Sequence, residues 1–311
     1  MNDPSLRELL QHLVASDGTV TTPLDGVKLF RSSRPVRRLP GIFAPGACIL
    51  LQGTKRAFFN GAAHVYDPTR YFCSVIPLPV EGDVPQASPE EPLLGLLVSF
   101  ETRTVAEVCL ALEAADPVRV SSRAVDELDG FRTVPCDGAF RRAVGGLLEA
   151  LADPVLLAVL GDARLRELLF TMLRGPAGPI IRGHRGTLRS IAGVLHHIRE
   201  HLADSLSIDE LARQAAMSKA VFHRRFKAAT SLSPLQFVKA VRLNEGARLI
   251  AQGTNVSTAA HQVGYSSPSQ FSREFRRQFD QTPREWRLAV APLGRPRTWI
   301  AEVPLYDSGD A

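Results

Sequence analysis

The sequence has few cysteines, few aromatic residues and no long apolar run. Four of 311 residues are cysteine, and aromatic residues make up 7%. The cysteines lie scattered, without a CxxC pair, at Cys48, Cys73, Cys109 and Cys136. This distribution excludes a disulfide framework and a cysteine zinc site, and it predicts buried thiols in a reducing compartment. Because no apolar run approaches the roughly 20 residues of a membrane helix, no membrane partner is expected.

An export signal is missing as well. The first residues, MNDPSLRELLQHL, are acidic and polar where a signal peptide needs a basic start and an apolar core. We therefore expect a cytoplasmic protein. With 45% hydrophobic and 22% charged residues the composition is that of a globular chain, and its length suits two domains better than one.

Signatures of catalysis are also scarce. His64 is the one histidine between residues 20 and 180, whereas a catalytic metal site in a β-barrel usually needs several. His197 and His201 have the spacing of a metal pair, but no Glu follows His197 immediately, so we interpret both as surface residues. No GxSxG, Walker A or GxGxxG motif occurs. We predict no enzymatic activity, no metal and no cofactor; an enzyme with an incidental basic half stays open as an alternative.

The charge is divided unevenly along the chain. Residues 1–181 carry a net charge of −3, residues 182–297 carry +11, and the last fourteen residues carry −3. Such asymmetry indicates that one part of the chain meets a polyanion and the other does not.

The front half is rich in turn residues and short β-type runs. Asn60-Gly61, between two such runs, predicts a hairpin, and the close spacing favours a small barrel or sandwich. The period then changes to that of a helix, and Gly-Pro-rich residues 175–186 look like a linker. The predicted strands are 27–31, 48–51, 56–60, 64–66, 71–76 and 93–99, and the predicted helices are 105–115, 138–152 and 154–174.

The basic part contains an internal repeat. Its two copies are LARQAAMSKAVFHRRFK (211–227) and AAHQVGYSSPSQFSREFRR (259–277). Small residues of the first copy recur 48 positions later, and its Phe and basic residues recur 49 positions later. Each copy is typical of a short helix, a tight turn and a second helix with Phe-x-x-x-Phe on one side. This is the pattern of a helix-turn-helix, so the sequence predicts a duplicated helix-turn-helix. A Ser207-x-x-Glu210 capping box opens the first copy, and Ser233-Pro234 starts a long connecting helix to about residue 251.

Polar and basic side chains occupy the face opposite the phenylalanines. In the first copy the stripe is Ala220, His223, Arg224 and Lys227; in the second it includes Ser269, Arg273 and Arg276. Arg can bond guanine bidentately and Gln can pair with adenine, whereas other basic residues meet phosphates. Ordinary surface helices would also be polar there, but two copies in register argue against that interpretation.

The C-terminal part resembles the AraC/XylS-type bacterial transcription regulators, from about residue 188 to 287. LSIDELARQAAMS, FHRRFK, SPLQFVKAVRL and above all VGYSSPSQFSREFRRQFDQTPREWR carry the resemblance. It implies two DNA-reading units joined by a long helix. It assigns base reading to Ala220, His223, Arg224, Ser269, Gln270 and Arg273. The expected phosphate contacts are Arg225, Lys227, Thr258, Ser266, Arg276, Arg277, Thr282 and Arg284.

One residue departs from the pattern of this family. Ala216 stands in the first turn where such turns often hold glycine, as Gly264 does in the second copy. If that position needs a positive φ, alanine costs about 1 kcal/mol there.

The front half is similar, less specifically, to the cupin-like N-terminal domain of one subgroup of the same family. GACILLQGTK, HVYDPTRYF, VIPLPVEGDV, EEPLLGLLVSF and RLRELLFTMLRGPAG carry this likeness, which implies effector sensing or dimerisation. The candidate effector-binding residues, near predicted strand ends, are Phe43, Cys48, His64, Tyr66, Tyr71 and Cys73. Core packing is the alternative for each, and an inert buried thiol is the alternative to a sensor thiol at Cys73.

The predicted fold is α+β multidomain, with a cupin-like β-barrel and appended helices followed by an all-α double helix-turn-helix. The expected boundaries are 1–180 for the sensing and dimerisation domain, 181–187 for the linker, 188–291 for the DNA-binding domain and 292–311 for a tail. We expect a sequence-specific transcription regulator whose partners are double-stranded promoter DNA, a small-molecule effector, a second copy in a homodimer, and RNA polymerase as a further candidate. The recognition helices should enter the major groove roughly 34 Å apart. An architectural DNA-binding protein without effector is the alternative from another class.

Overall fold

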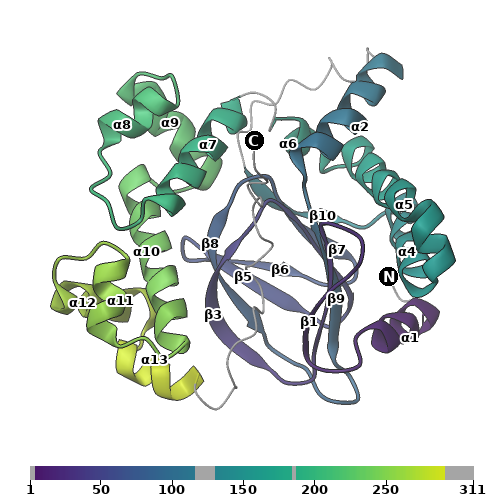
Figure 1. Cartoon of the computed structure of the whole chain (residues 1–311), viewed down its shortest axis with the longest axis horizontal. Helices are drawn as coiled ribbons and strands as arrows, with labels where there is room; N and C mark the ends of the chain where they lie inside the picture. The colour runs from purple at the N-terminus through teal and green to yellow at the C-terminus, as the bar shows by residue number, and fades with distance from the viewer. Residues whose placement is uncertain (1–3, 116–129, 184–186, 291–311) are drawn as a thin grey trace.

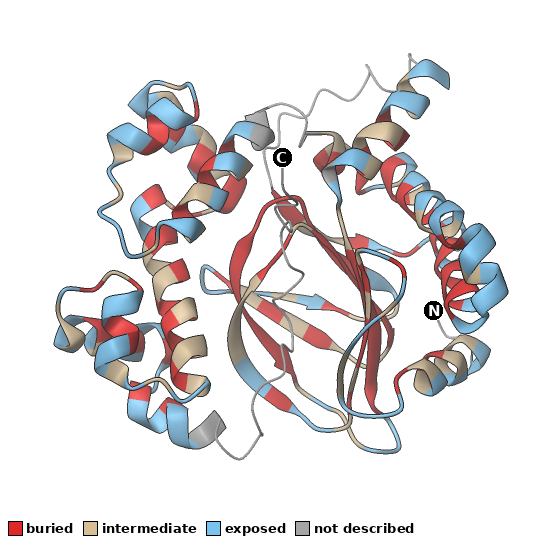
Figure 2. Ribbon diagram, in the orientation of Figure 1, coloured by how far each residue is buried: buried red, intermediate tan, exposed pale blue. Residues whose placement is uncertain are grey.

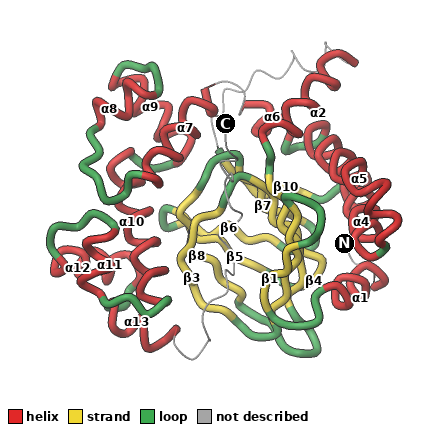
Figure 3. The backbone as a smooth tube through the Cα atoms, in the orientation of Figure 1, coloured by secondary structure: helices red, strands yellow, loops and turns green. Residues whose placement is uncertain are grey.

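The front half of the chain forms two antiparallel β-sheets, and the back half is helical (Figures 1 and 3). The computed structural model describes residues 4–115, 130–183 and 187–290. One sheet has the strand order β1-β2-β9-β4-β7-β10 and the other β3-β8-β5-β6. The predicted β-rich domain followed by a helical domain is confirmed; in the described ranges the strands form two separate sheets and do not close into one barrel. The strands are β1 (Gly18–Thr21), β2 (Val27–Ser32), β3 (Val36–Phe43), β4 (Gly46–Gln52), β5 (Lys55–Phe59), β6 (Ala62–Tyr66), β7 (Arg70–Ser74), β8 (Leu78–Val84), β9 (Leu93–Ser99) and β10 (Phe131–Pro135).

The β5–β6 hairpin forms where the Asn-Gly pair predicted it. Asn60 and Gly61 both have positive φ, +50° and +76°, the combination that tight hairpin turns require. Phe59 pairs with Ala62 across the turn. The alternation in β5 buries Lys55, Ala57 and Phe59, so that these side chains face the other sheet.

Two aspartates mark the starts of helices that follow the sheets. Asp137 accepts a hydrogen bond from the Phe140 amide at the start of α4, and Asp153 caps α5 in the same way. Both helices have the predicted boundaries, whereas α1 was not predicted. The helices of this half are α1 (Pro4–Leu13), α2 (Thr102–Ala115), α4 (Gly138–Ala152), α5 (Pro154–Arg174) and α6 (Gly178–Gly183).

The predicted linker is partly wrong. Residues 178–183 form helix α6, in which Ile180 and Ile181 are buried. Gly178-Pro179 does not break a helix here because it opens one, and proline at a first turn lacks only an amide that would be unpaired anyway. Residues 184–186 of the predicted linker, and the tail from 292, lie outside the described residues.

The helices of the back half match the repeat. The Ser207 hydroxyl accepts from the Glu210 amide at the start of α8, and Ser233 forms a full capping box with Gln236 at the start of α10. None of the described helices has both the length and the apolar character to cross a membrane. These helices are α7 (Thr187–Glu200), α8 (Ile208–Gln214), α9 (Lys219–Thr230), α10 (Pro234–Ala251), α11 (Val256–Gln262), α12 (Pro268–Phe279) and α13 (Pro283–Val290).

The two sheets are covered on their outer faces by different helices. Helices α1 and α4 pack on the outside of the six-stranded sheet, where Phe140 stacks on Tyr71 with ring centroids 4.4 Å apart. On the opposite side α10 packs against β3 and β8. The strands are buried where these layers meet, and exposed residues gather on the outer edge of α8, α9, α11 and α12 (Figure 2). Helix α10 is thus the helix of the back half that packs against the four-stranded sheet.

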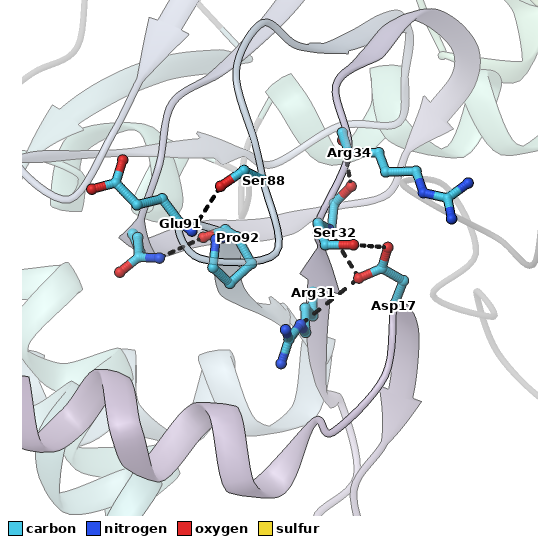
Figure 4. A network of polar contacts seen from close by, with 9 residues as sticks. Asp17, Arg31, Ser32, Arg34, Ser88, Glu91 and Pro92 are labelled. Carbon is cyan, nitrogen blue, oxygen red and sulfur yellow. Dashed lines mark hydrogen bonds and ion pairs between the residues drawn. The ribbon is translucent and has the colours of Figure 1, made fainter.

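A group of polar contacts links residues in loops of the β-domain (Figure 4). The Asp17 carboxylate accepts from the Ser33 amide at 2.9 Å and lies 3.8 Å from Arg31. In the neighbouring loop, the Glu91 amide donates to the Ser88 hydroxyl. These contacts hold loops of the β-domain in place.

Candidate nucleic-acid interface

The two helix-turn-helix units have the same backbone design. We call α8 and α9 the first unit, and α11 and α12 the second unit. The turn residue Ala216 has a φ of +53°, and Gly264 at the same place in the second unit has +85°. In each turn the next amide bonds back to the first helix, from Met217 to the Ala212 carbonyl at 3.0 Å and from Tyr265 to the equivalent carbonyl at 2.9 Å. The duplicated helix-turn-helix predicted from the repeat is therefore present.

The extra residue of the second unit lies in its turn. Ser218 caps α9, and Ser267, at an offset of 49, caps α12. Gly264 still follows the offset of 48 from Ala216, so the insertion falls between Gly264 and Ser267. Ser266, a predicted phosphate contact, is the exposed residue just before the cap.

Phenylalanines fix the inner face of each recognition helix. Phe222 and Phe226 of α9 are fully buried, and Phe271 and Phe275 of α12 are their buried counterparts. Phe226 meets Phe237 of α10 edge to face, with centroids 5.5 Å apart. Because these faces are anchored, the opposite face of each helix is held toward solvent.

The residues predicted to read bases are all exposed on that outer face. Arg224 and Arg273 form no ion pair with any other described residue, so their guanidinium groups remain available for acceptors on a ligand. Arginine in this state presents a planar fork that fits guanine O6 and N7. The exposed set is Ala220, His223, Arg224, Ser269, Gln270 and Arg273.

A carboxylate holds one of these side chains. Glu274 on α12 accepts from the Gln270 amide at 3.4 Å and from the Tyr265 hydroxyl at 2.9 Å, and Lys239 of α10 lies 3.0 Å from it. Burial opposes ionisation of Glu274, but these bonds outweigh it, so the pKa of Glu274 is lowered. These bonds link α12 to α10 and give the side-chain amide of Gln270 a preferred orientation.

The predicted phosphate contacts have different surroundings. Arg225 and Thr282 are half-buried, and the Thr282 hydroxyl and amide already bond Glu285 at the start of α13. Thr282 therefore acts as a helix cap in this structure. The remaining predicted contacts are all exposed: Lys227, Thr258, Ser266, Arg276, Arg277 and Arg284.

The opposite ends of both recognition helices touch the β-domain. The Asn60 amide of the β5–β6 turn donates to the Ser231 carbonyl just after α9, at 3.0 Å. Gln278 near the end of α12 donates to Glu81 of β8 at 3.3 Å, and burial raises the pKa of Glu81. Sequence reasoning missed these contacts, since residues more than 170 positions apart along the chain leave no local signal.

The six predicted effector-binding residues do not share one site. Phe43 and Tyr66 pack on Phe72 between the sheets, with centroids 4.9 and 5.6 Å apart. Cys48 also lies between the sheets, and His64, half-buried, contacts Phe72 and Phe131.

Tyr71 and Cys73 are on the other face of β7, because neighbouring residues of a strand point to opposite sides. Tyr71 stacks on Phe140 of α4. Burial raises the pKa of the Cys73 thiol, which favours the inert thiol over the sensor thiol. These two candidate residues therefore face a different side of the sheet from the other four.

A lysine that sequence reasoning missed lies between the sheets. Lys55 is 2% exposed, and its Nζ lies 4.0 Å from Cys48 Sγ and 5.1 Å from the centre of the Phe30 ring. No carboxylate among the described residues pairs with it, and burial lowers its pKa. The alternation of Lys55 with Ala57 and Phe59 was the available signal, because it places the lysine on the buried face of β5.

The described residues contain no group of three or more His, Cys, Asp and Glu side chains able to hold a metal ion. The ring centroids of His197 and His201 lie 4.3 Å apart, and His201 Nδ1 is 2.9 Å from a carboxylate oxygen of Asp204, which follows α7.

Comparison with known proteins decides the family. Residues 23–180, just over half of the chain, match the family described as AraC-type transcriptional regulator N-terminus, and residues 211–289 match a helix-turn-helix domain. The chain belongs to the AraC-type transcriptional regulators. The predicted resemblance is thereby confirmed for both halves of this AraC-type regulator.

Individual relatives match more narrowly. The HTH-type transcriptional activator RhaS of Escherichia coli (strain SE11) is 32% identical over 95 residues, which are 30% of this chain and 34% of RhaS. The chain thus covers about a third of the length of the curated relatives it matches. The structure of the DNA-binding domain of AdpA in complex with a target DNA has 31% identity and a TM-score of 0.33, covering 34% of this chain and 96% of that one.

One solved structure is similar along most of the chain. ToxT from Vibrio cholerae O395, bound to (E)-4-(8-methylnaphthalen-1-yl)but-3-enoic acid, covers 85% of this chain and 98% of its own, with a TM-score of 0.53 and 10% identity. At this identity the likeness concerns the fold alone, and it supports the arrangement of a β-domain followed by a double helix-turn-helix.

Proposed function

We propose that this AraC-type regulator binds double-stranded promoter DNA through both helix-turn-helix units and controls transcription there, without a catalytic role. The observation that carries the proposal is the pair of matching units, each with an exposed arginine on the face opposite its buried phenylalanines; neither arginine forms an ion pair within the described part of the chain. Arg224 and His223 in the first unit, and Gln270 and Arg273 in the second, are the proposed base contacts, with Ala220 and Ser269 beside them.

Basic residues around these helices are proposed to hold the DNA backbone. Three of these residues are exposed on the two units, Lys227, Arg276 and Arg277, and exposed Arg284 lies on α13. They contribute to the net charge of +11 in residues 182–297. Such contacts position a recognition helix without reading sequence, and they make affinity depend on salt.

The β-domain is proposed to bind a small-molecule effector between its sheets. Lys55, Cys48 and Tyr66 supply polar groups within an otherwise apolar interior, and the lysine has no carboxylate partner among the described residues. An effector with an acidic or carbonyl group would complete its bonding. The acid bound by ToxT, a protein of similar fold, is consistent with this class of ligand.

We propose that the contacts between the halves transmit the effector's presence. Asn60 and Glu81 belong to the four-stranded sheet and touch the ends of α9 and α12 opposite to the predicted base contacts. A shift of this sheet relative to the other would therefore reach both recognition helices.

The remaining assignments are proposals of the same kind. The domains are 1–180 and 188–291, the site of action is the cytoplasm, where promoter DNA lies, and RNA polymerase is a candidate partner. A homodimer is proposed through α5, on which Val155 and Val159 are 72% and 73% exposed.

DNA selection tests the proposed function. The full chain should enrich one two-part sequence from a pool of randomised duplexes, and Arg224→Ala and Arg273→Ala should each lower affinity for it by about tenfold or more. Arg103→Ala is the matched control, because Arg103 is 92% exposed on α2 in the other half. Equal binding of all duplexes would instead indicate an architectural protein.

A further inference from the structure

The two helix-turn-helix units do not share an apolar core. Phe222, Phe226 and Val241 belong to the core that also includes the β-domain. Leu243, Ala247 and the phenylalanines of α12 belong to a separate core. Helix α10 contributes to both, and the division falls between Val241 and Leu243. Apolar packing therefore fixes each unit on α10, but the buried residues of the described ranges do not form one continuous core across both units; partly buried Leu39 of β3 packs against both cores.

Arg242 stands at this division and bonds to both sides. Its Nη2 donates to the Asp204 carbonyl at 2.8 Å, and its Nη1 donates to the Gly264 carbonyl at 3.2 Å. Asp204 follows α7, which packs against α8 and α9, so it belongs to the side of the first unit. Gly264 is the turn residue of the second unit. One guanidinium group thus joins two backbone carbonyls across the division.

The backbones themselves come close at the same place. A Cβ on Gly264 would lie 2.5 Å from the Leu202 carbonyl oxygen and 2.8 Å from the Arg242 guanidinium carbon. The turn of the second unit therefore packs directly against the residues that follow α7. A glycine is required here for contact as well as for its φ of +85°.

We propose that Arg242 is a positioning residue that sets the orientation of the second unit relative to the first, and so determines which separation of half-sites the protein accepts. This inference rests on the proposed function. Arginine suits the role because its planar fork reaches two acceptors in fixed directions, which a lysine cannot reproduce. Arg242 need not touch DNA to act on specificity.

The proposal concerns half-site spacing. One added base pair turns the duplex by about 34° and lengthens it by roughly 3.4 Å. A rigid pair of units would then lose simultaneous contact with both half-sites, whereas a loosely joined pair would adapt. We expect the wild-type chain to lose about tenfold or more in affinity when one base pair is added to or removed from its selected site. Arg242→Met should bind the three spacings within about threefold of one another.

A merely structural role would give a different result. Arg242→Met would then lower affinity on all three duplexes by the same factor and keep the wild-type spacing profile, and that outcome would overturn the proposal. Arg287→Met is the control, because Arg287 is an exposed arginine on α13, away from the Asp204 and Gly264 carbonyls that Arg242 bonds. It should keep the wild-type profile, and Arg242→Lys should restore it only in part.

A second measurement does not depend on DNA. Arg213 and His261 are exposed and occupy equivalent positions in α8 and α11, and the four native cysteines are buried. Spin labels on the R213C/H261C chain should give one narrow distance distribution by pulsed electron resonance, which Arg242→Met broadens. An unchanged distribution would refute the role of Arg242. If the wild type selects no two-part site, the proposed function fails, and the labels still decide the role of Arg242.

Discussion

The left-handed turn residue shows how equivalent positions of a repeat can differ in the space available for a side chain. Ala216 adopts a φ of +53°, where a Cβ is unfavourable, so the cost expected for alanine at this place is incurred. Gly264 adopts +85°, but its missing Cβ also makes room for the Leu202 carbonyl. The two positions are equivalent in the repeat and differ only in their neighbours.

We predict that Ala216→Gly raises the free energy of unfolding by about 0.5–1 kcal/mol, because it relieves backbone strain at a solvent-exposed turn. Gly264→Ala should lower it by about 2–4 kcal/mol, since strain and steric overlap add. Urea denaturation of the full chain measures both changes. As a control, Ala228→Gly inside α9 should lower stability by about 1 kcal/mol; stabilisation there would show that the Ala216 effect is not specific to the turn.

Lys55 is a second residue whose role depends on burial. We predict that Lys55→Met raises the free energy of unfolding at pH 7 by about 1–3 kcal/mol, because it removes a buried amine that lacks a full hydrogen-bonding partner. Burial lowers the pKa of Lys55, so the unfolded chain binds its proton more tightly than the folded chain. Wild-type stability relative to Lys55→Met should therefore rise as pH increases toward the usual lysine pKa near 10.5.

Denaturation of both chains between pH 7 and pH 10 measures this difference. Burial raises the pKa of Cys48, which contributes in the opposite direction, and Lys55 counteracts part of that rise in the wild type. Lys227→Met, an exposed matched control, should change stability by less than about 0.5 kcal/mol. A destabilised Lys55→Met chain would contradict the prediction.

At the scale of elements, capping residues and periodicity made several helices predictable. Asp137 and Asp153 stand directly before α4 and α5, and apolar periodicity fills both, so sequence and structure agree on their bounds. Strands β3 and β8 were not predicted. Strand β3 is an edge strand containing Pro40, and β8 carries buried Glu81 and Asp83 that read as polar loop. Helix α10 packs against both strands, which no local pattern indicates.

The recognition helices give the prediction that belongs to this scale. Arg273→Ala should cost about 1–3 kcal/mol of binding free energy on the selected duplex and relax the base preference in one half-site only. Its physical reason is the loss of a bidentate contact to a base edge. Quantitative binding to a library of single-base variants measures the change; a uniform loss across the library would assign Arg273 to a phosphate.

Lys227 is expected to behave differently. Lys227→Ala should weaken binding to every duplex alike and reduce the slope of log affinity against log salt by about 1, because it removes one phosphate contact. Titrations at several salt concentrations measure the slope. A changed base preference would instead place Lys227 in the groove.

At the scale of the whole molecule, the β-domain braces both units from the side opposite the predicted DNA face. Besides Asn60 and Glu81, the Gly130 amide donates to the Ala229 carbonyl near the end of α9, at 3.0 Å. Leu39 of β3 packs against the core of the second unit. Both recognition helices thus contact the same domain.

We predict that Asn60→Ala with Gln278→Ala loosens this contact. Each side-chain bond contributes about 0.5–1.5 kcal/mol, so the amides of β3, β8 and the inner face of α10 should exchange hydrogen about tenfold faster or more. Exchange in α4 and α5 should stay unchanged and serves as the internal control. Unaltered exchange in β3 would show that apolar packing alone holds the halves together.

The sequence by itself determined the repeat, the turns that require left-handed residues, the basic charge of the back half and the exposed residues proposed to read DNA. These follow from local periodicity and from the chemistry of single side chains. Tertiary structure alone decided that Tyr71 and Cys73 face α4, that Lys55 is buried without a carboxylate partner among the described residues, and that Arg242 joins the two units. Each of these depends on elements far apart in the chain, whose contact arises from packing and leaves no periodic pattern to detect.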